Sequence, residues 1–203
     1  TPTKKGSIKV DLSFVYKCTK EILKYSKRKK IIVTKSTVPV GTGDEIEKIL
    51  KKKKKLFTVI SNPEFLREGE AIRDFRYPDR IVIGSNEKRT FNIMRKLYAP
   101  LTNKGSKFFT TSRRGAELIK YASNAFLATK ITFINELANL CEKSGVNIED
   151  ISLGMGSDSR IGGRFLRAGP AYGGSCFPKD TKGLVSAAEK YNCLLYTSPS
   201  PRD

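Results

Sequence analysis

Residues 31–43, IIVTKSTVPVGTG, run from a strand-like segment into a turn. The first four residues are β-branched and predict a short buried strand, while the Pro and Gly residues that follow predict the turn. A helix is predicted over about 43–53, and a second strand over 56–60. Strand, helix and strand in this order are typical of an α/β layer with parallel strands.

The alternation extends in both directions from this stretch. Upstream, residues 12–29 carry apolar side chains at broadly helical spacing. Downstream, residues 80–84 and 107–110 predict a third and a fourth strand. The first half of the chain is therefore expected to form an α/β layer.

The second half of the chain has a different character. Residues 113–143 contain no Pro and a single Gly, which predicts one helix of about 30 residues or two in tandem, long enough to join two bodies. Seven of the sixteen glycines then fall between Gly154 and Gly174, where the backbone can approach a ligand closely. A last helix is expected over about 178–191.

The chain contains no His, which excludes several kinds of chemistry. Ser-His-Asp and Cys-His catalytic pairs and His-containing zinc sites all require imidazole. The four cysteines match no C-x-x-C pattern, so we expect no metal, no disulfide scaffold, and a reducing, cytoplasmic setting. No run approaches the ~20 apolar residues that span a bilayer, so no membrane association is expected.

The chain is strongly basic, with 39 Lys and Arg against 20 Asp and Glu and a net charge of +19. The lysine run at 51–55 is interpreted as a solvated helix end, with a nucleic-acid surface as the alternative. No aromatic residues are interleaved with the basic runs and no nucleic-acid-binding motif is present, so no nucleic-acid partner is expected. A positive field still favours the arrival of small anionic ligands.

Residues 173–180, GGSCFPKD, form the motif with the clearest chemistry. Pro178 suits the first position of a helix, which places Cys176 just ahead of the helix start and beside Lys179. The helix start and the Lys179 ammonium both favour the thiolate form, so Cys176 is a candidate nucleophile. Asp180 lies four residues further on, where it could reach a water or a substrate hydroxyl. The alternative is a structural Cys buried in a glycine turn.

Lys120 and Asn124 are four residues apart and share one face of the long helix. Their apolar neighbours Leu118, Tyr121 and Phe126 indicate that this stretch is largely buried. A buried Lys can act as a base, and an Asn amide can donate to an oxyanion. The spacing alone equally allows a snorkelling Lys and a capping Asn.

Glu64 and Glu68 show the same spacing at the carboxyl end of the second predicted strand, where open parallel sheets bind ligands. Glu64 is alternatively an ordinary acid in the first turn of a helix. Thr37 follows the preceding strand, as a ligand contact or as a turn residue. Residues 41–46 read G-x-G-x-x-I, a dinucleotide fingerprint without its third Gly, and they receive little weight.

Several of these motifs, in the same order, resemble the UDP-glucose 6-dehydrogenase family, a branch of the UDP-glucose/GDP-mannose dehydrogenases. The resemblance runs from Thr1 to about Asn192. It is carried by the segments KSTVPVG (35–41), NPEFLREG (62–69), DRIVIG (79–84), Lys120 with Asn124, RIG (160–162) and GGSCFPKD (173–180).

The resemblance implies a fold in two parts. Residues 1–111 would be the back part of a Rossmann-like NAD-binding α/β domain, and residues 112–192 an all-helical central domain that forms a homodimer. Residues 193–203 are interpreted as a non-native tail, and residues 1–5 as neither a signal peptide nor a natural start. The chain is thus expected to be an internal piece of a longer enzyme, with little turnover alone.

The resemblance also implies a reaction, the oxidation of a UDP-sugar alcohol to a carboxylate by two NAD. Cys176 would attack the intermediate aldehyde, and the thiohemiacetal would become a thioester that water hydrolyses. Lys120 and Asn124 would stabilise the oxyanion, and Asp180 would take the alcohol proton through a water. Glu64 would assist hydrolysis, and Thr37 would position the catalytic water.

The same resemblance implies the binding residues. Those near the nicotinamide cofactor would be Thr37, Glu68 and Lys179. Those at the sugar nucleotide would be Phe65, Leu66, Lys120, Asn124, Arg167, Tyr172 and Gly173, with Arg160 reaching the substrate of the partner subunit. Three alternatives stay open: a dehydrogenase of GDP-mannose or another nucleotide sugar, a nucleic-acid-binding module, and a purely structural dimerisation fragment.

Overall fold

The computed structural model describes residues 10–195, apart from the side chains of Lys52 and Lys54. The predictions for residues 1–5 and for most of the 193–203 tail lie outside the described residues. In chain order the elements are α1 (Ser13–Tyr25), β1 (Lys30–Thr34), α2 (Thr42–Ile49), the 3-10 helix η1 (Leu50–Leu56), β2 (Phe57–Ser61), α3 (Ala71–Arg76), β3 (Arg80–Gly84), α4 (Lys88–Thr102), β4 (Lys107–Thr111), α5 (Arg113–Ser144), α6 (Ile148–Gly156) and α7 (Phe177–Glu189).

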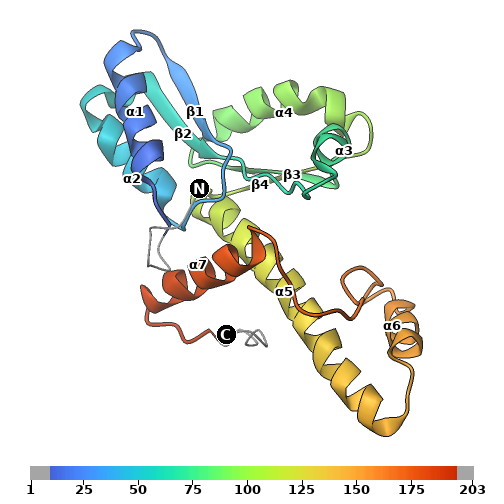
Figure 1. The fold of residues 1–203 in the computed structure, drawn as a ribbon. Coiled ribbons are helices and arrows are strands. Elements are labelled where there is room, and N and C mark those ends of the chain that lie inside the picture. Colours follow the sequence, from blue (N-terminus) through green and yellow to red (C-terminus); the bar gives the residue numbers. More distant parts are fainter. Residues whose placement is uncertain (1–9, 196–203) are drawn as a thin grey trace. The chain divides into compact units, whose positions relative to one another are not determined.

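The chain divides into two compact units, residues 1–120 and 121–203, called here the first and the second unit. The first unit contains a four-stranded sheet in the order β1-β2-β3-β4 (Figure 1). Its predicted α/β character is confirmed. No helix in the described part of the chain is long and apolar enough to cross a membrane.

The sheet is mixed rather than wholly parallel. β1 pairs with β2 and β3 with β4 in parallel, but β2 and β3 are antiparallel, with Ser61 opposite Gly84. The expectation of parallel strands is therefore wrong for the central pairing. A parallel crossover requires a connection that covers the sheet, whereas the connection here holds only the short helix α3, none of whose residues is buried.

Both faces of the sheet are covered by helices, because successive strand residues point to opposite faces. On one face, Val59 packs in a cluster with Ile46 and Leu50 of α2 and η1. On the other face, the next residue, Ile60, packs with Met94 of α4. Figure 1 shows α1 and α2 on one side of β1 and β2 and α4 on the other.

The predicted helices are confirmed with some changes at their ends. α2 ends at Ile49, so the lysine run lies in η1 and not on the α-helix. Lys51, Lys53 and Lys55 are exposed, and the Nζ of Lys53 donates to the Leu23 carbonyl at 3.0 Å. Residues 113–144 form one helix, α5, and not two in tandem.

The second unit consists of the carboxyl-terminal part of α5 with α6 and α7. Tyr121 is fully buried, and a Cβ added to Gly183 of α7 would lie 2.6 Å from its ring. Gly183 therefore allows α7 to approach α5 closely. The glycine-rich residues 157–176 between α6 and α7 contain no helix or strand.

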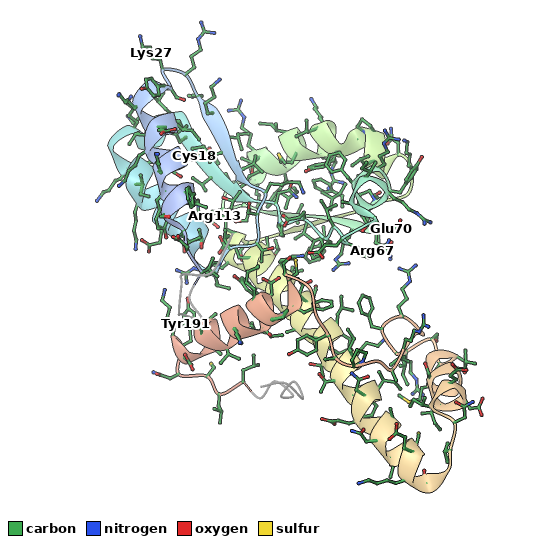
Figure 2. All side chains as sticks on the ribbon, in the orientation of Figure 1. Cys18, Lys27, Arg67, Glu70, Arg113 and Tyr191 are labelled. Carbon is green, nitrogen blue, oxygen red and sulfur yellow. The ribbon has the colours of Figure 1, made fainter. Side chains whose placement is uncertain are left out.

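The first turns of α5 pack tightly against the sheet and against α2. A Cβ added to Gly84 would lie 2.6 Å from the Ala116 Cβ and from the Ser112 carbonyl. Arg113, labelled in Figure 2, is 4% exposed, and its Nη2 donates at 2.6 Å both to Asp44 and to Glu47. This close packing and the ion pairs of the buried Arg113 with Asp44 and Glu47 hold the amino-terminal end of α5 within the first unit.

Replacing Gly84 by Ala is expected to lower the free energy of unfolding by about 1–3 kcal/mol or more, because the added methyl overlaps the α5 backbone. Urea unfolding followed by circular dichroism measures the loss. Gly154→Ala on α6 is the control, since nothing lies within 4 Å of its added Cβ and helix propensity favours Ala by about 0.5–1 kcal/mol. Equal midpoints for Gly84→Ala and wild type would contradict the packing.

A second prediction concerns acid unfolding. Burial acts to raise the pKa of Asp44, but hydrogen bonds from Arg114 and Arg113 and their charges outweigh it, so the pKa lies below its ordinary 3.8. A lowered carboxyl pKa stabilises the fold above the ordinary value, and this stabilisation is lost as the pH falls through the folded pKa. At neutral pH, the free energy of unfolding of the wild type is expected to exceed that of Asp44→Asn by about 1–2 kcal/mol.

The difference in unfolding free energy between wild type and Asp44→Asn is measured from pH 2 to pH 7. It should be constant above about pH 5 and shrink below the ordinary pKa. Glu45→Gln is the control, because Glu45 is exposed and its ion pair is with Lys48, which is exposed as well. A difference that does not change with pH would count against the ion pair.

Candidate active site

Two predicted site residues meet just beyond the carboxyl ends of β1 and β2, which are neighbours in parallel. The Thr37 hydroxyl, from a side chain 6% exposed, donates to Glu64 Oε1 in a long hydrogen bond of 3.5 Å. Glu64 Oε2 is buried, and no described residue donates to it. Because ligands bind at this edge of open α/β sheets, the unsatisfied oxygen fits a ligand group or a water there.

Asn62 gives the Glu64 segment its shape. Its backbone N–H donates to the Thr34 carbonyl at 2.9 Å and its Nδ2 to the Val82 carbonyl at 3.0 Å, while the Tyr98 hydroxyl donates to its Oδ1. Helical backbone angles are also disfavoured at Asn62, because it directly precedes Pro63. Residues 62–67 accordingly form no helix, and α3 begins only at Ala71.

The helical interpretations of Glu64 and Glu68 are therefore wrong. Glu64 is not an acid in a first helical turn, and the two carboxylates do not share a helix face. Glu68 is exposed in the turn that precedes α3. Arg67 fixes this turn, because its backbone N–H and Nε donate to Asp74 at 2.9 Å and its Nη2 at 2.6 Å.

Lys120 is buried, with only 6% of its surface exposed. Its Nζ lies 5.2 Å from the centre of the Phe65 ring, and the guanidinium of Arg80 lies 4.0 Å from the same ring. The snorkelling alternative for Lys120 is thus wrong, because a snorkelling ammonium would reach bulk water. The ring of Phe65 instead lies against two cations, the Lys120 ammonium and the Arg80 guanidinium.

Lys35 belongs to the same group of charges, although sequence reasoning assigned it no role. Lys35 is exposed as a residue, but partial desolvation of its amine lowers the pKa; the negative charge of Glu64 opposes this shift and the positive charge of Lys120 adds to it. Lys35, Glu64 and Lys120 therefore interact electrostatically at one edge of the sheet. Its position directly after a predicted strand was the signal that could have identified Lys35.

Glu117, one turn before Lys120 on α5, was also missed. It is 3% exposed, and its carboxylate accepts hydrogen bonds from the N–H groups of Gly41 at 2.7 Å and Gly43 at 2.9 Å and from the Ser61 hydroxyl at 3.1 Å. Burial raises the pKa of Glu117, while these hydrogen bonds partly offset the shift and Asp44 adds to it.

The glycine turn at the start of α2 therefore does not fit the pyrophosphate of NAD. Gly41 has φ +95°, and its N–H and that of Gly43 point at Glu117 and not at a free site. A Cβ on Gly43 would lie 3.1 Å from Glu117 Oε1. The structure agrees with the little weight given to the incomplete fingerprint, because the N–H groups of both glycines donate to Glu117 of α5.

The Cys176 motif lies in the second unit. Cys176 is exposed as the N-cap residue of α7, so the alternative of a buried structural Cys is wrong. Pro178 occupies the second helical position rather than the first, because α7 begins at Phe177. Ser175 Oγ lies 3.8 Å from Cys176 Sγ.

Asp180, in the first turn of α7, is fully buried. Its Oδ2 accepts a hydrogen bond of 2.6 Å from Asn124 Nδ2, and its Oδ1 is paired with Lys179 Nζ. Asn124 thus serves a buried acid in the middle of α5 and caps no helix. A buried carboxylate held by an amide and an ammonium is an arrangement suited to proton transfer and oxyanion stabilisation.

The remaining predicted residues are more accessible. Leu118 and Phe126 are exposed, contrary to the expectation that both flank a buried stretch. Arg160 pairs with Asp158 at 2.6 Å, and Tyr172 packs edge-on against Phe177 with ring centres 6.3 Å apart. Leu66, Arg160, Arg167 and Gly173 are exposed.

Comparison with known proteins identifies the family. The NAD binding domain of the UDP-glucose/GDP-mannose dehydrogenase family matches residues 1–102, and the central domain of that family matches residues 114–198. The UDP-glucose 6-dehydrogenase of Rhizobium meliloti (strain 1021) is 54% identical over 196 residues, which cover 95% of this chain and 45% of that protein. The chain spans about half the length of the curated relatives it matches.

Solved structures agree with this match. The UDP-glucose dehydrogenase of Pyrobaculum islandicum has a TM-score of 0.86 and 38% identity over 95% of this chain and 45% of its own. The UDP-D-ManNAc dehydrogenase of Pyrococcus horikoshii has a TM-score of 0.80 and 26% identity over 93% of this chain and 45% of its own. The resemblance found in the motifs is thereby confirmed: the chain belongs to the UDP-glucose/GDP-mannose dehydrogenase family, and its first half matches the NAD binding domain of that family.

Proposed function

We propose that the protein containing this chain oxidises UDP-glucose to UDP-glucuronate with NAD. The observation that carries the proposal is the start of α7, where exposed Cys176 precedes the buried Asp180 held by Asn124 and Lys179. A thiol at a helix start is a suitable nucleophile toward an aldehyde. The curated relatives of about 50% identity named UDP-glucose 6-dehydrogenase support the choice of substrate.

The proposed reaction gives each catalytic group the role that the family resemblance implies. Asp180, through a water, takes the proton of the sugar alcohol as it becomes an aldehyde. Cys176 Sγ then bonds to the aldehyde carbon, and Lys120 and Asn124 stabilise the oxyanion of the thiohemiacetal. NAD, when bound, supplies the acceptor for the two hydrides that leave the same sugar carbon, one molecule for each.

Loss of the second hydride leaves a thioester on Cys176. Glu64 assists the attack of a water that Thr37 positions, and the carbon–sulfur bond then breaks to release the carboxylate and restore the thiol. The unsatisfied Oε2 of Glu64 supports this role, because it is free to accept a proton or a hydrogen bond from water. No step requires imidazole, in accord with a chain that contains no His.

The binding roles are proposed from the family. Glu68 and Lys179 would lie near the nicotinamide, while Phe65, Leu66, Arg167, Tyr172 and Gly173 would contact the sugar nucleotide and Arg160 the substrate of the partner subunit. The pyrophosphate needs donors other than those of Gly41 and Gly43, which Glu117 occupies. We assign residues 1–111 to the NAD-binding domain, 112–192 to the central domain and 193–203 to a tail.

The central domain is proposed to form a homodimer through α5. Phe126, Phe133 and Leu140 follow one another at intervals of seven residues, and their exposed fractions are 65%, 46% and 60%. Residues seven apart lie on one face of a helix. A stripe of exposed large apolar side chains of this kind is typical of an interface.

Two further assignments complete the proposal. The exposed Lys51, Lys53 and Lys55 are proposed to be solvated and to bind no nucleic acid. All four cysteines are free, which supports a reducing, cytoplasmic setting.

Replacing Cys176 by Ser in the full-length protein is expected to reduce formation of UDP-glucuronate about a thousandfold or more, because the nucleophile of the second oxidation is lost. Product is measured by chromatography, NADH by absorbance and UDP-glucose binding by calorimetry. Binding should survive, and exposed Cys18→Ser should behave as wild type. Undiminished acid formation would remove Cys176 from the nucleophile role, and faster NADH formation with GDP-mannose or another nucleotide sugar would change the substrate.

The double variant Phe126→Glu, Phe133→Glu is expected to convert the dimer to a monomer, because two charges would be buried in the interface. Light scattering during size-exclusion chromatography gives the mass of the full-length protein. Phe14→Glu on α1 is a matched control, since Phe14 is 70% exposed outside the proposed stripe. A dimer that survives the double variant would place the interface elsewhere.

A further inference from the structure

The carboxylate of Glu117 joins three segments of the first unit. It accepts hydrogen bonds from Gly41 and Gly43 at the start of α2 and from Ser61 at the end of β2, and it is itself part of α5. Each of these segments carries a proposed catalytic group a few residues away. Thr37 lies four residues before Gly41, Glu64 three residues after Ser61, and Lys120 three residues after Glu117.

We propose that Glu117 is a positioning residue, which holds Thr37, Glu64 and Lys120 in register with one another. This inference rests on the proposed function, since these three groups are catalytic only within it. Glu117 itself touches neither substrate nor cofactor in this proposal. It acts through the backbone of the turn before α2, through Ser61, and through the first turns of α5.

The surroundings of Glu117 favour positioning over a simple packing role. Its two oxygens receive three donors, all from groups that are buried or backbone, so the carboxylate fixes both the direction and the distance of each segment. A side chain on Gly43 would crowd α5, because its Cβ would lie 3.1 Å from Glu117 Oε1 and 3.2 Å from Arg113 Cδ, so the glycine keeps this contact close. The ion pairs of Arg113 with Asp44 and Glu47 bind the same two helices one turn earlier.

An amide cannot replace this carboxylate. Glu117→Gln keeps the size of the side chain, but it points an NH2 group at one of three hydrogen-bond donors and removes the charge. One of the three segments must therefore move. A displacement of about 1 Å at catalytic groups is enough to reduce the rate about 100-fold.

The first measurement uses the present chain and needs no activity. In Glu117→Gln, the NMR signals of the Gly41 and Gly43 amides and of the Thr37 methyl group are expected to shift, while those of Thr90 and Thr129 stay unchanged. Glu45→Gln, an exposed carboxylate on the same α2, is the matched control and should leave all five signals in place. An unmoved Thr37 methyl would overturn the proposal, whatever reaction the protein catalyses.

The second measurement uses the full-length protein. Glu117→Gln is expected to reduce kcat for UDP-glucose oxidation about 100-fold, with KM changed by less than about threefold, since the lost positioning acts on the reacting groups. Rates are normalised to the folded fraction, which removes any loss caused by instability alone. An unchanged kcat in a variant whose Thr37 signal has shifted would show that the contact is only structural.

A third variant covers the case in which Glu117→Gln does not fold. Ser61→Ala removes one of the three hydrogen bonds and leaves those of Gly41 and Gly43. It should reduce kcat about tenfold, with the free energy of unfolding lowered by only about 1 kcal/mol. A wild-type kcat in Ser61→Ala would overturn the link to the Glu64 segment. Wild-type protein without NADH formation would defeat the proposed function instead, and the NMR result would still decide whether Glu117 positions Thr37.

Discussion

The carboxylate of Glu117 rests on the first N–H groups of α2, and the arrangement of the first unit around its carboxyl edge depends on this contact. A helix start offers unpaired donors and a positive dipole end, which attract an anion. Here the anion is supplied by the chain itself, from α5. Because Ser61 donates to the same carboxylate, the end of β2 is held with both helices, and the loops that follow β1 and β2 leave the sheet from fixed points.

This contact also explains why the G-x-G sequence at the start of α2 does not offer its N–H groups to a dinucleotide. The same two features that bind phosphate in a fingerprint, a left-handed Gly at the turn and a second Gly that permits close approach, are present at Gly41 and Gly43. What differs is the occupant of the helix start. A motif of this kind therefore indicates an anion site, and only the structure shows whether a ligand or a side chain fills it.

The sequence predicted the strands, α5 and the start of α7, because each depends on local patterns: β-branched runs, an uninterrupted helical stretch, and Pro after Cys176. It did not predict that β3 runs against β2, which depends on how little of the sheet α3 covers. It assigned no element to α4 or α6. Glu117 and Arg113 were missed for a similar reason, since their partners lie far away in sequence and no local spacing marks such contacts.

The two units hold a buried acid in different ways, and the difference matches their proposed tasks. Glu117 accepts hydrogen bonds from neutral donors, two backbone N–H groups and a hydroxyl, which suits a carboxylate proposed to position the backbone. Asp180 is held by the side chains of Asn124 and Lys179, which can rotate and exchange partners when a water or substrate arrives. In the proposed reaction, proton transfer falls to such a carboxylate beside a Lys, whereas the acid proposed to order the backbone takes no part in the chemistry.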